Sequence, residues 1–218
     1  LTDIDVLQNA YTAQTKLEGY YGDTWSWNLS GGYAYTREER NHKNGLVDLD
    51  QVQLALAEGY DPTAIGLNAS ALDAAKVQGI EAYEASMTQA RLLTTGELFE
   101  FTELWGTGGP MSMAIGVEGQ WETTNDDHDD VLIDTNLNDR ILTNQFGSRA
   151  VGSTFMELVS YPLNSVEVQL TGRYDTYSDF GDTFNPKMAI GYRPSNKILL
   201  RSSIGTTFTA PSVRNLIQ

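Results

Sequence analysis

Residues 172–216 read GRYDTYSDFGDTFNPKMAIGYRPSNKILLRSSIGTTFTAPSVRNL. Apolar side chains recur at every second position on both sides of a short turn sequence at 194–196, as Met188 and Ile190 do before it and Leu200 after it. A period of two is typical of a β-strand with one apolar face, because successive side chains point to opposite sides of the sheet. The segment therefore predicts two long antiparallel strands joined by a tight turn.

Three further hairpins with the same alternation precede this one. They occupy residues 9–35, 83–121 and 150–174, which gives eight long strands in all. Two long polar segments, 37–80 and 125–148, connect the hairpins on the opposite side. Short turns thus lie at one end of the predicted sheet, and long loops lie at the other.

The first of these loops contains two stretches with the composition of helices. They read DLDQVQLALAEG at 48–59 and NASALDAAKVQG at 68–79. In the second stretch Asn68 or Ser70 can cap the N-terminus, and each stretch ends in glycine, which favours a helix C-terminus. We expect two short helices inside this loop.

The length of the alternation and the placement of aromatic residues favour a membrane barrel over a soluble β-sandwich. Sandwich strands are usually about five or six residues long. Here the strands are longer, and aromatic residues lie near their ends, where an outer-membrane barrel has its aromatic girdles. These residues are Tyr21, Trp25, Trp27, Tyr33, Tyr35, Trp105, Trp121, Tyr161 and Tyr192. The apolar runs are far shorter than the roughly 18 residues of a membrane helix, so the chain could cross a membrane only as strands of a closed sheet.

Charge and composition exclude several partners and sites. The 218 residues carry 29 acidic and 14 basic side chains, and the formal net charge of -15 repels nucleic acid. The chain has no cysteine, which excludes thiolate metal sites and cysteine nucleophiles. Both histidines, His42 and His128, fall in predicted loops, and no catalytic triad can be assembled around them. We therefore expect no enzymatic activity, no bound metal and no cofactor.

Several sequence blocks resemble the barrel of TonB-dependent outer-membrane receptors. Residues 172–216 are similar to that family's arginine-tyrosine-aspartate strand, its Asn-Pro-Lys strand start and its Phe-x-Ala-Pro-Ser strand end. The block GELFEFTELWGTGGPMSMAIGVEGQWE resembles a hairpin of the same family, and STFMELVSYPL, with Glu157 and Pro162, looks like a third match. These blocks cover most of residues 83–216, whereas the first 80 residues resemble the family in pattern alone.

The resemblance implies a 22-stranded barrel, plugged by an N-terminal domain, in contact with outer-membrane lipid and lipopolysaccharide. Such receptors import a scarce small ligand, for example a ferric siderophore, cobalamin, haem or an oligosaccharide, with energy that the TonB–ExbB–ExbD system delivers through the plug domain. Residues 1–218 contain no recognisable plug domain, TonB box, signal peptide or terminal aromatic strand. We therefore expect the chain to be an internal portion of the barrel, about a third of it.

The most acidic stretch, within 125–148, contains the first set of candidate ligand-binding residues. This set consists of Asp126, Asp127, His128, Asp129 and Asp130. They could contact a cation or a ferric ligand, although a histidine within a run of charges is more often plain soluble surface. Further along, the spacing of Asp134, Asn136 and Asn138 matches a calcium loop, but Asp139 replaces the required glycine and Gln145 the bidentate glutamate. A solvated extracellular loop is therefore the preferred interpretation.

The second set of candidates consists of charged residues on the polar side of the last strands. They are Glu167, Arg173, Lys187, Arg193 and Arg201. In a barrel these side chains face the lumen, where they could line a ligand path or pair with a plug. The simpler interpretation is cross-strand charge pairing, which contributes about 0.2–1 kcal/mol for each pair.

The leading hypothesis is thus a segment of a TonB-dependent receptor barrel, with ligand specificity in the loops 37–80 and 125–148. Two alternatives stay open. One is a soluble β-rich binding or adhesion domain, and the other is a passive porin-type barrel. The loop sequences do not discriminate among the possible ligands.

Overall fold

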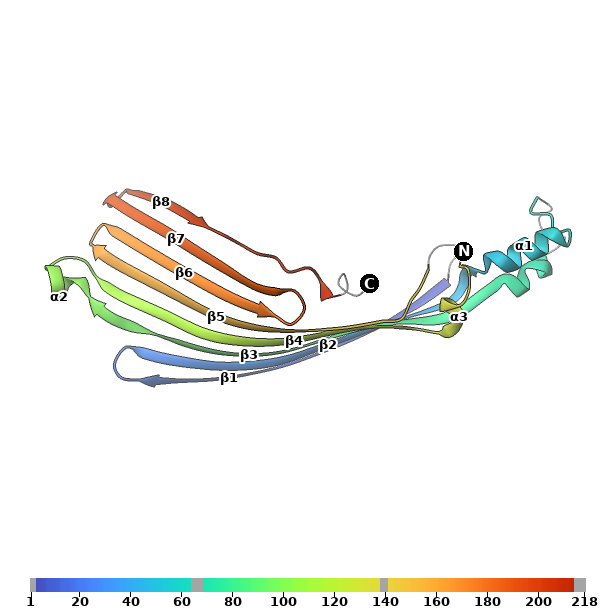
Figure 1. The fold of residues 1–218 in the computed structure, drawn as a ribbon, viewed down its shortest axis with the longest axis horizontal. Helices are drawn as coiled ribbons and strands as arrows, with labels where there is room; N and C mark the ends of the chain where they lie inside the picture. Colours follow the sequence, from blue (N-terminus) through green and yellow to red (C-terminus); the bar gives the residue numbers. More distant parts are fainter. Residues whose placement is uncertain (1–2, 64–68, 138–140, 214–218) are drawn as a thin grey trace.

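A single antiparallel sheet makes up most of the molecule, and the computed structural model describes residues 3–63, 69–137 and 141–213 of it. The eight strands are neighbours in the order in which they follow along the chain, and Figure 1 shows them as one long, curved layer. The strands are β1 (Asp3–Tyr21), β2 (Trp25–Val47), β3 (Lys76–Glu100), β4 (Pro110–His128), β5 (Gln145–Leu163), β6 (Val166–Tyr177), β7 (Gly181–Ser195) and β8 (Ile198–Gly205). The helices are α1 (Leu49–Ala57), the 3-10 helix η1 (Ala69–Ala75), α2 (Phe101–Trp105) and α3 (Asp130–Ile133).

The predicted all-β fold and its four hairpins are confirmed. In the first hairpin β1 ends at Tyr21 and β2 begins at Trp25, and in the last one β7 ends at Ser195 and β8 begins at Ile198. The turns of the four hairpins lie at one end of the sheet, and α1, η1 and α3 lie at the other (Figure 1). The connection from β6 to β7, residues 178–180, is equally short but joins the opposite ends of these strands. Among the described residues no helix has the length and apolarity needed to span a membrane.

The cross-strand register places the apolar positions of all eight strands on one side of the sheet, which we call the apolar face. Aligned pairs on this face include Leu17 with Leu29, Leu92 with Val117, Leu170 with Met188, and Met188 with Ile204. These side chains are exposed, and Ile204 reaches 77%. A soluble β-sandwich would bury such a face against a second sheet. Within the described residues the only sheet is this one, so the apolar face has no protein layer over it.

The apolar face ends in a belt of charges part-way along the strands. On β2 apolar side chains recur from Trp25 to Tyr35, and Arg37 and Glu39 then occupy the same face. Arg37 Nη1 lies 2.6 Å from Glu84 Oε1 on β3, so this belt is an inter-strand ion pair. The apolar stretch of β2 is about 35 Å long at roughly 3.3 Å per residue, which at the usual tilt matches an apolar band about 25 Å tall.

The strands extend further than the sequence pattern indicates, so the predicted limits of both loops are wrong. Residues 37–47 and 76–80 belong to β2 and β3, and the connection between these strands is limited to 48–75. Likewise β4 continues to His128 and β5 starts at Gln145. The loop interpretation took charged residues as a sign of irregular structure. Here, however, they pair across strands while the alternation continues.

The helices of the first loop also differ in part from the prediction. The stretch 48–59 contains α1 as expected, whereas the described part of the stretch 68–79 forms the short η1 and then enters β3 at Lys76. The proposed cap Asn68 lies outside the described residues. Pairing of Lys76 with Val47 of β2 replaces helical hydrogen bonds at this point, which is why the second helix stops early.

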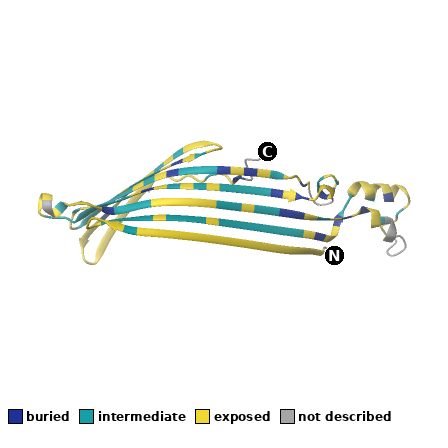
Figure 2. Ribbon diagram, turned by 90° about the horizontal axis from the view of Figure 1, so that it is seen from below, coloured by how far each residue is buried: buried dark blue, intermediate teal, exposed yellow. Residues whose placement is uncertain are grey.

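Few of the described residues are buried, and Figure 2 shows the buried positions mostly toward the ends of the strands near α1 and α3. The cluster of buried apolar residues is small and consists of Leu46, Val77, Leu132, Leu137 and Leu142. The sheet is therefore held mainly by its hydrogen-bonded strand pairs, with a compact core at one end.

Close packing on the polar face of the sheet, opposite the apolar face, depends on Gly116 of β4. A Cβ there would lie 2.4 Å from the Phe155 ring and 2.8 Å from the Leu92 carbonyl oxygen, which is backbone and cannot rotate away. We expect Gly116→Ala to destabilise strands β3, β4 and β5 by about 1–3 kcal/mol, measured as a lower urea midpoint of the folded protein in detergent. Gly119 of the same strand has open space around its Cβ position, so Gly119→Ala is the matched control. Equal midpoints for the two variants would contradict this packing argument.

Candidate functional site

The described parts of the two predicted loops pack together as one unit, which we call the distal module: residues 46–63, 69–77, 129–137 and 141–142, with α1, η1 and α3 at its centre. Asp48 forms an antiparallel bridge with Leu137. Leu49 N donates to Asn136 O at 2.8 Å, and Asn136 Nδ2 donates to Asp50 Oδ1 at 3.1 Å. The connections after β2 and after β4 are therefore held to each other by backbone and side-chain contacts.

Local sequence explains why α1 begins where it does. The Asp48 side chain accepts hydrogen bonds from Asp50 N and Gln51 N, at 2.9 and 3.3 Å, which is the usual role of an N-cap aspartate. Asp48 N in turn donates to Ala75 O at 2.8 Å, so the start of the helix is fixed to the end of η1. Asp48 thus both begins α1 and joins the two ends of the connection between β2 and β3.

The apolar cluster around Leu132 of α3 joins the strand ends to the second loop. Leu132 of α3 is fully buried, and a Cβ on Gly79 of β3 would lie 2.7 Å from the Leu132 side chain. Asp129 also ties the start of α3 to β3, because its Oδ2 accepts from Ile80 N at 2.8 Å and its N donates to Ile80 O at 3.0 Å. The distal module is therefore seated on the strand ends.

A buried polar cluster lies on the polar face just below the distal module. His42 Nε2 of β2 lies 2.7 Å from Glu81 Oε1 of β3, and both side chains are at most 1% exposed. Tyr83 donates its hydroxyl to Glu81 Oε2 at 2.7 Å. The Tyr83 ring meets His128 of β4 edge-on, with a centroid separation of 5.3 Å. Three strands are thus joined through one carboxylate and one aromatic ring.

A cavity of about 380 Å³ opens next to this cluster, lined by Thr36, Glu38, Arg40, Tyr83, Glu84, Ala85, Thr124 and Asp126. The Arg40 guanidinium stands 5.3 Å from the centre of the Tyr83 ring, and Arg40 Nε donates to Glu38 Oε1 at 2.6 Å. The hydrogen bond to Glu38 raises the pKa of Arg40 above its ordinary value, so this cation stays charged. Glu84 borders the cavity, but its carboxylate lies on the apolar face, where it pairs with Arg37. The side chains on the polar face supply one cation, two carboxylates, three hydroxyls and an aromatic ring, which suits a polar ligand.

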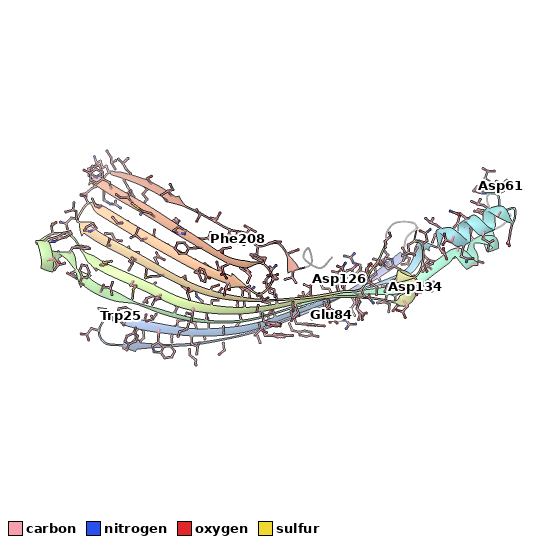
Figure 3. All side chains as sticks on the ribbon, in the orientation of Figure 1. Trp25, Asp61, Glu84, Asp126, Asp134 and Phe208 are labelled. Atoms are coloured by element: carbon pink, nitrogen blue, oxygen red, sulfur yellow. The ribbon has the colours of Figure 1, made fainter. Side chains whose placement is uncertain are left out.

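The first set of predicted ligand-binding residues is divided by the structure. Asp126 and His128 lie on β4, not in a loop, and both are buried on the polar face. Asp127 alternates to the other face, while Asp129 occupies the N-cap position of α3 without a side-chain capping bond, and Asp130 is the first residue of that helix. Figure 3 shows Asp126 part-way along the sheet, between the strand end at Trp25 and the helical end at Asp61. Only Asp126 lines the cavity.

The calcium-like spacing finds no support in the described residues. Asn138 and Asp139 lie outside them, and Asn136 uses its side chain to bind α1. Asp134 is the C-cap of α3, and Gln145 begins β5. Within the part of the chain that the structure describes, no three histidine or acidic side chains are grouped so that they could hold a metal ion.

The second set of candidates lies on the polar face of β6, β7 and β8, where pairing dominates. Arg173 Nε donates to Asp175 Oδ1 at 2.7 Å, and its Nη2 donates to Ser153 Oγ at 2.9 Å and to Glu118 Oε1 at 3.2 Å. Asp175 also accepts from Ser153 Oγ at 2.6 Å. This network links β4, β5 and β6 and stiffens the wall.

The remaining candidates are more exposed. Arg201 of β8 lies 3.5 Å from Glu167 of β6, reaching across the side-chain-free Gly191 of β7. Glu167 and Arg201 line a shallow cavity of about 250 Å³, and Lys187 borders it as well. Arg193 is exposed, and its N donates to Ser165 O at 2.8 Å. Glu167 and Arg201 thus form the cross-strand pair that the simpler interpretation expects.

Sequence reasoning missed Arg40 and Tyr83, which line the cavity, and Glu81, which lies in the buried cluster beside it. Arg40 fell in the predicted loop 37–80, Glu81 was left between loop and strand, and Tyr83 was expected to begin a strand but was given no role in a site. The signal that could have identified them is the continuing period of two: Glu38, Arg40 and His42 fall on one side of β2. A cross-strand register is needed to bring that side against Glu81 and Tyr83.

Comparison with known proteins places the chain in one family. The family described as "TonB dependent receptor-like, beta-barrel" matches residues 2–218. Among curated proteins no match was found.

Two solved structures match the chain, and both are mutants of the ferric enterobactin receptor of Pseudomonas aeruginosa. The first is 15% identical with a TM-score of 0.60, and the match covers 94% of this chain and 26% of that chain. The second, in complex with enterobactin, is 11% identical with a TM-score of 0.44 and coverages of 94% and 34%. The chain therefore spans about a quarter of the first receptor, and at this identity the likeness concerns the fold alone.

Proposed function

Because the chain belongs to the TonB-dependent receptor β-barrel family, we propose that it forms part of the wall of an outer-membrane receptor that actively imports a scarce ligand. The observation that carries this proposal is the two-sided sheet: an exposed apolar face of membrane height and an opposite face of paired charges. In a barrel the first side meets lipid and the second lines the lumen. No catalytic role is proposed.

The sheet also supports a proposal about orientation. Short turns lie at one end and the distal module at the other, which is how periplasmic turns and extracellular loops are arranged in such barrels. The distal module then stands outside the cell, beyond the belt at Arg37 and Glu84, where it would meet lipopolysaccharide and the arriving ligand. The turn at Asn196 and Lys197 faces the periplasm.

The remainder of the wall comes from other parts of the receptor in this proposal. β1 and β8 are the two ends of the strand order, and in lipid each would need a hydrogen-bonded neighbour. A 22-stranded barrel would supply these neighbours, and a plug domain within it would connect the lumen to TonB–ExbB–ExbD. Exposed luminal charges such as Lys187 and Arg193 would be available to the plug or the ligand.

The cavity beside Arg40, Tyr83 and Asp126 is the proposed ligand contact of this chain. It lies on the luminal side near the extracellular end, where an arriving ligand would first leave bulk water. Ferric siderophores, haem, cobalamin and oligosaccharides all carry polar groups that this mixture of cation, carboxylates and ring could bind. The ligand class is therefore left to the uptake experiment.

Uptake by the full-length receptor in an outer-membrane host tests this proposal. Radiolabelled ferric enterobactin is the first probe, followed by a ferric hydroxamate, haem, cobalamin and a labelled oligosaccharide. One of these should accumulate in cells with intact TonB–ExbB–ExbD and fail to accumulate when TonB is deleted, while surface binding persists. Accumulation that survives TonB deletion would instead identify a passive barrel. A receptor that fractionates with soluble proteins and stays monomeric without detergent would identify a soluble domain.

A further inference from the structure

The segment that follows β8, residues 206–213, leaves the sheet and lies against the polar face of the wall; we call it the strap. Thr206 N donates to Pro186 O at 3.0 Å, which is the last ladder bond between β7 and this segment. Pro186 has no N–H to return to Thr206, so the ladder stops there. The chain is then free to turn away from β7, and Figure 1 shows it diverging from that strand.

One buried arginine holds the strap. Arg149 of β5 is only 4% exposed, and its Nη1 donates to the Pro211 carbonyl oxygen at 2.8 Å. Its Nε donates to Asp179 Oδ2, in the turn between β6 and β7, at 2.7 Å. The guanidinium therefore bridges the wall, the β6–β7 turn and the strap.

Aromatic rings complete the contact. Phe208 of the strap lies 5.5 Å from Phe180 and 6.1 Å from Tyr177, measured between ring centres, and Tyr177 stacks on Phe180 at 4.2 Å. The Arg149 guanidinium stands over both wall rings, 5.8 Å from Tyr177 and 5.4 Å from Phe180. Val213, further along the strap, is 7% exposed. Docking thus buries an apolar side chain and surrounds the cation with rings.

The docked state also has a cost, which makes release physically accessible. Arg149 Nη2 is buried and has no hydrogen-bond partner among the described residues. A buried charged donor without an acceptor is destabilising, and undocking would return it to water or to another acceptor. Phe208 is still 44% exposed, so undocking gives up only part of its contact area. Opposing terms of this kind allow two positions of the strap.

We propose that residues 206–213 form a hinged strap on the luminal wall, which Arg149 holds in the docked position and whose release widens the lumen beside β5, β6 and β7. Arg149 is a positioning residue in this proposal. The part that the strap plays in transport rests on the proposed function, but its docking does not.

Thiol labelling of the full-length receptor tests the docking directly. The chain contains no cysteine, so a single Val213→Cys substitution in a cysteine-free receptor reports the strap alone. Labelling by a charged maleimide tracks the open population when closing is fast. With Arg149→Met added, labelling should accelerate at least about tenfold, as expected for loss of a charge-assisted hydrogen bond. Arg149→Lys should give an intermediate rate, because one ammonium does not reproduce the planar fork.

Three controls separate strap release from general loosening. Arg201→Met removes an exposed arginine of the same face, whose side chain is 65% exposed, and should leave the Val213→Cys rate unchanged. A cysteine at Ala189, on the luminal side of β7, should label at one rate with and without Arg149→Met. Heat-modifiable migration in gels should show that each barrel is folded. The proposal is overturned if Arg149→Met leaves labelling at position 213 slow, or if position 189 accelerates equally. Neither result depends on uptake, so failure here is distinct from failure of the proposed function.

Discussion

Replacing Glu81 with alanine is expected to loosen the extracellular ends of β2, β3 and β4 by about 3–5 kcal/mol, the usual cost of removing one partner from a buried pair. Glu81 is 0% exposed and is the common partner of His42 and Tyr83. Without its carboxylate, the His42 and Tyr83 contacts that it makes are lost in a place that water does not reach. Hydrogen exchange of the strand amides around His42 and Tyr83 should accelerate a hundredfold or more, since about 1.4 kcal/mol corresponds to a factor of ten.

Two variants test the assignment of this effect to burial. Glu81→Gln keeps a carbonyl acceptor of similar size and should lose much less than Glu81→Ala. Glu18 also forms an ion pair, with Lys16 at 2.8 Å, but its side chain is 62% exposed. Glu18→Ala should therefore change exchange by a factor of a few at most. If Glu81→Ala behaved like Glu18→Ala, the buried cluster would not be holding these strands.

Replacing Leu132 with alanine is expected to open the distal module by about 2–5 kcal/mol, the range for a buried leucine in a core that cannot collapse onto the cavity. Leu132 is fully buried and packs on Gly79 of β3. Because Leu49 N donates a hydrogen bond to Asn136 O, the destabilisation should also reach α1, which lies in the connection between β2 and β3. Exchange of the α1 amides, residues 51–57, should therefore accelerate although the substitution is in α3.

Val131 provides the matched control in the same short helix, since it is 47% exposed. Val131→Ala should leave α1 exchange close to that of the unsubstituted receptor. If Leu132→Ala accelerated amide exchange in α3 but not in α1, the connections after β2 and after β4 would be independent loops. Faster exchange in both helices would support a distal module that responds as a unit. Such a response is needed if ligand contact on one connection is to affect the other.

Sequence pattern reached the fold because the barrel wall is built from local alternation. The pairs Leu17 with Leu29 and Met188 with Ile204 lie on the face that a period of two assigns to them. The last turn, predicted at 194–196, lies at 196–197 between β7 and β8, so its position was found to within about two residues for the same reason. Residues 37–47 continue the alternation with charged side chains, and they were assigned to a loop. The sequence of a strand does not show whether a charged side chain has an ion-pair partner on the neighbouring strand.

The residues of the proposed site show the same division. Asp126 and His128 were singled out by their acidic surroundings, and both do lie beside the buried cluster. Their partners lie on strands that are distant in sequence: Tyr83 belongs to β3 and Arg40 to β2, and only the register between the strands brings them together. The role of Arg149 is similar, since its contacts at Asp179 and Pro211 lie 30 and 62 residues away.

The amino-acid sequence by itself determined the strands, the two faces and the end at which the long connections lie, since all three follow from the period of two and the turn residues. The family resemblance could also be read from it. Tertiary structure alone decided that the two long connections form one distal module, that Glu81 sits at the centre of a buried cluster and that the strap docks on Arg149. Each of these depends on the register between distant strands, which fixes which side chains meet, and no local pattern encodes that register across long connections.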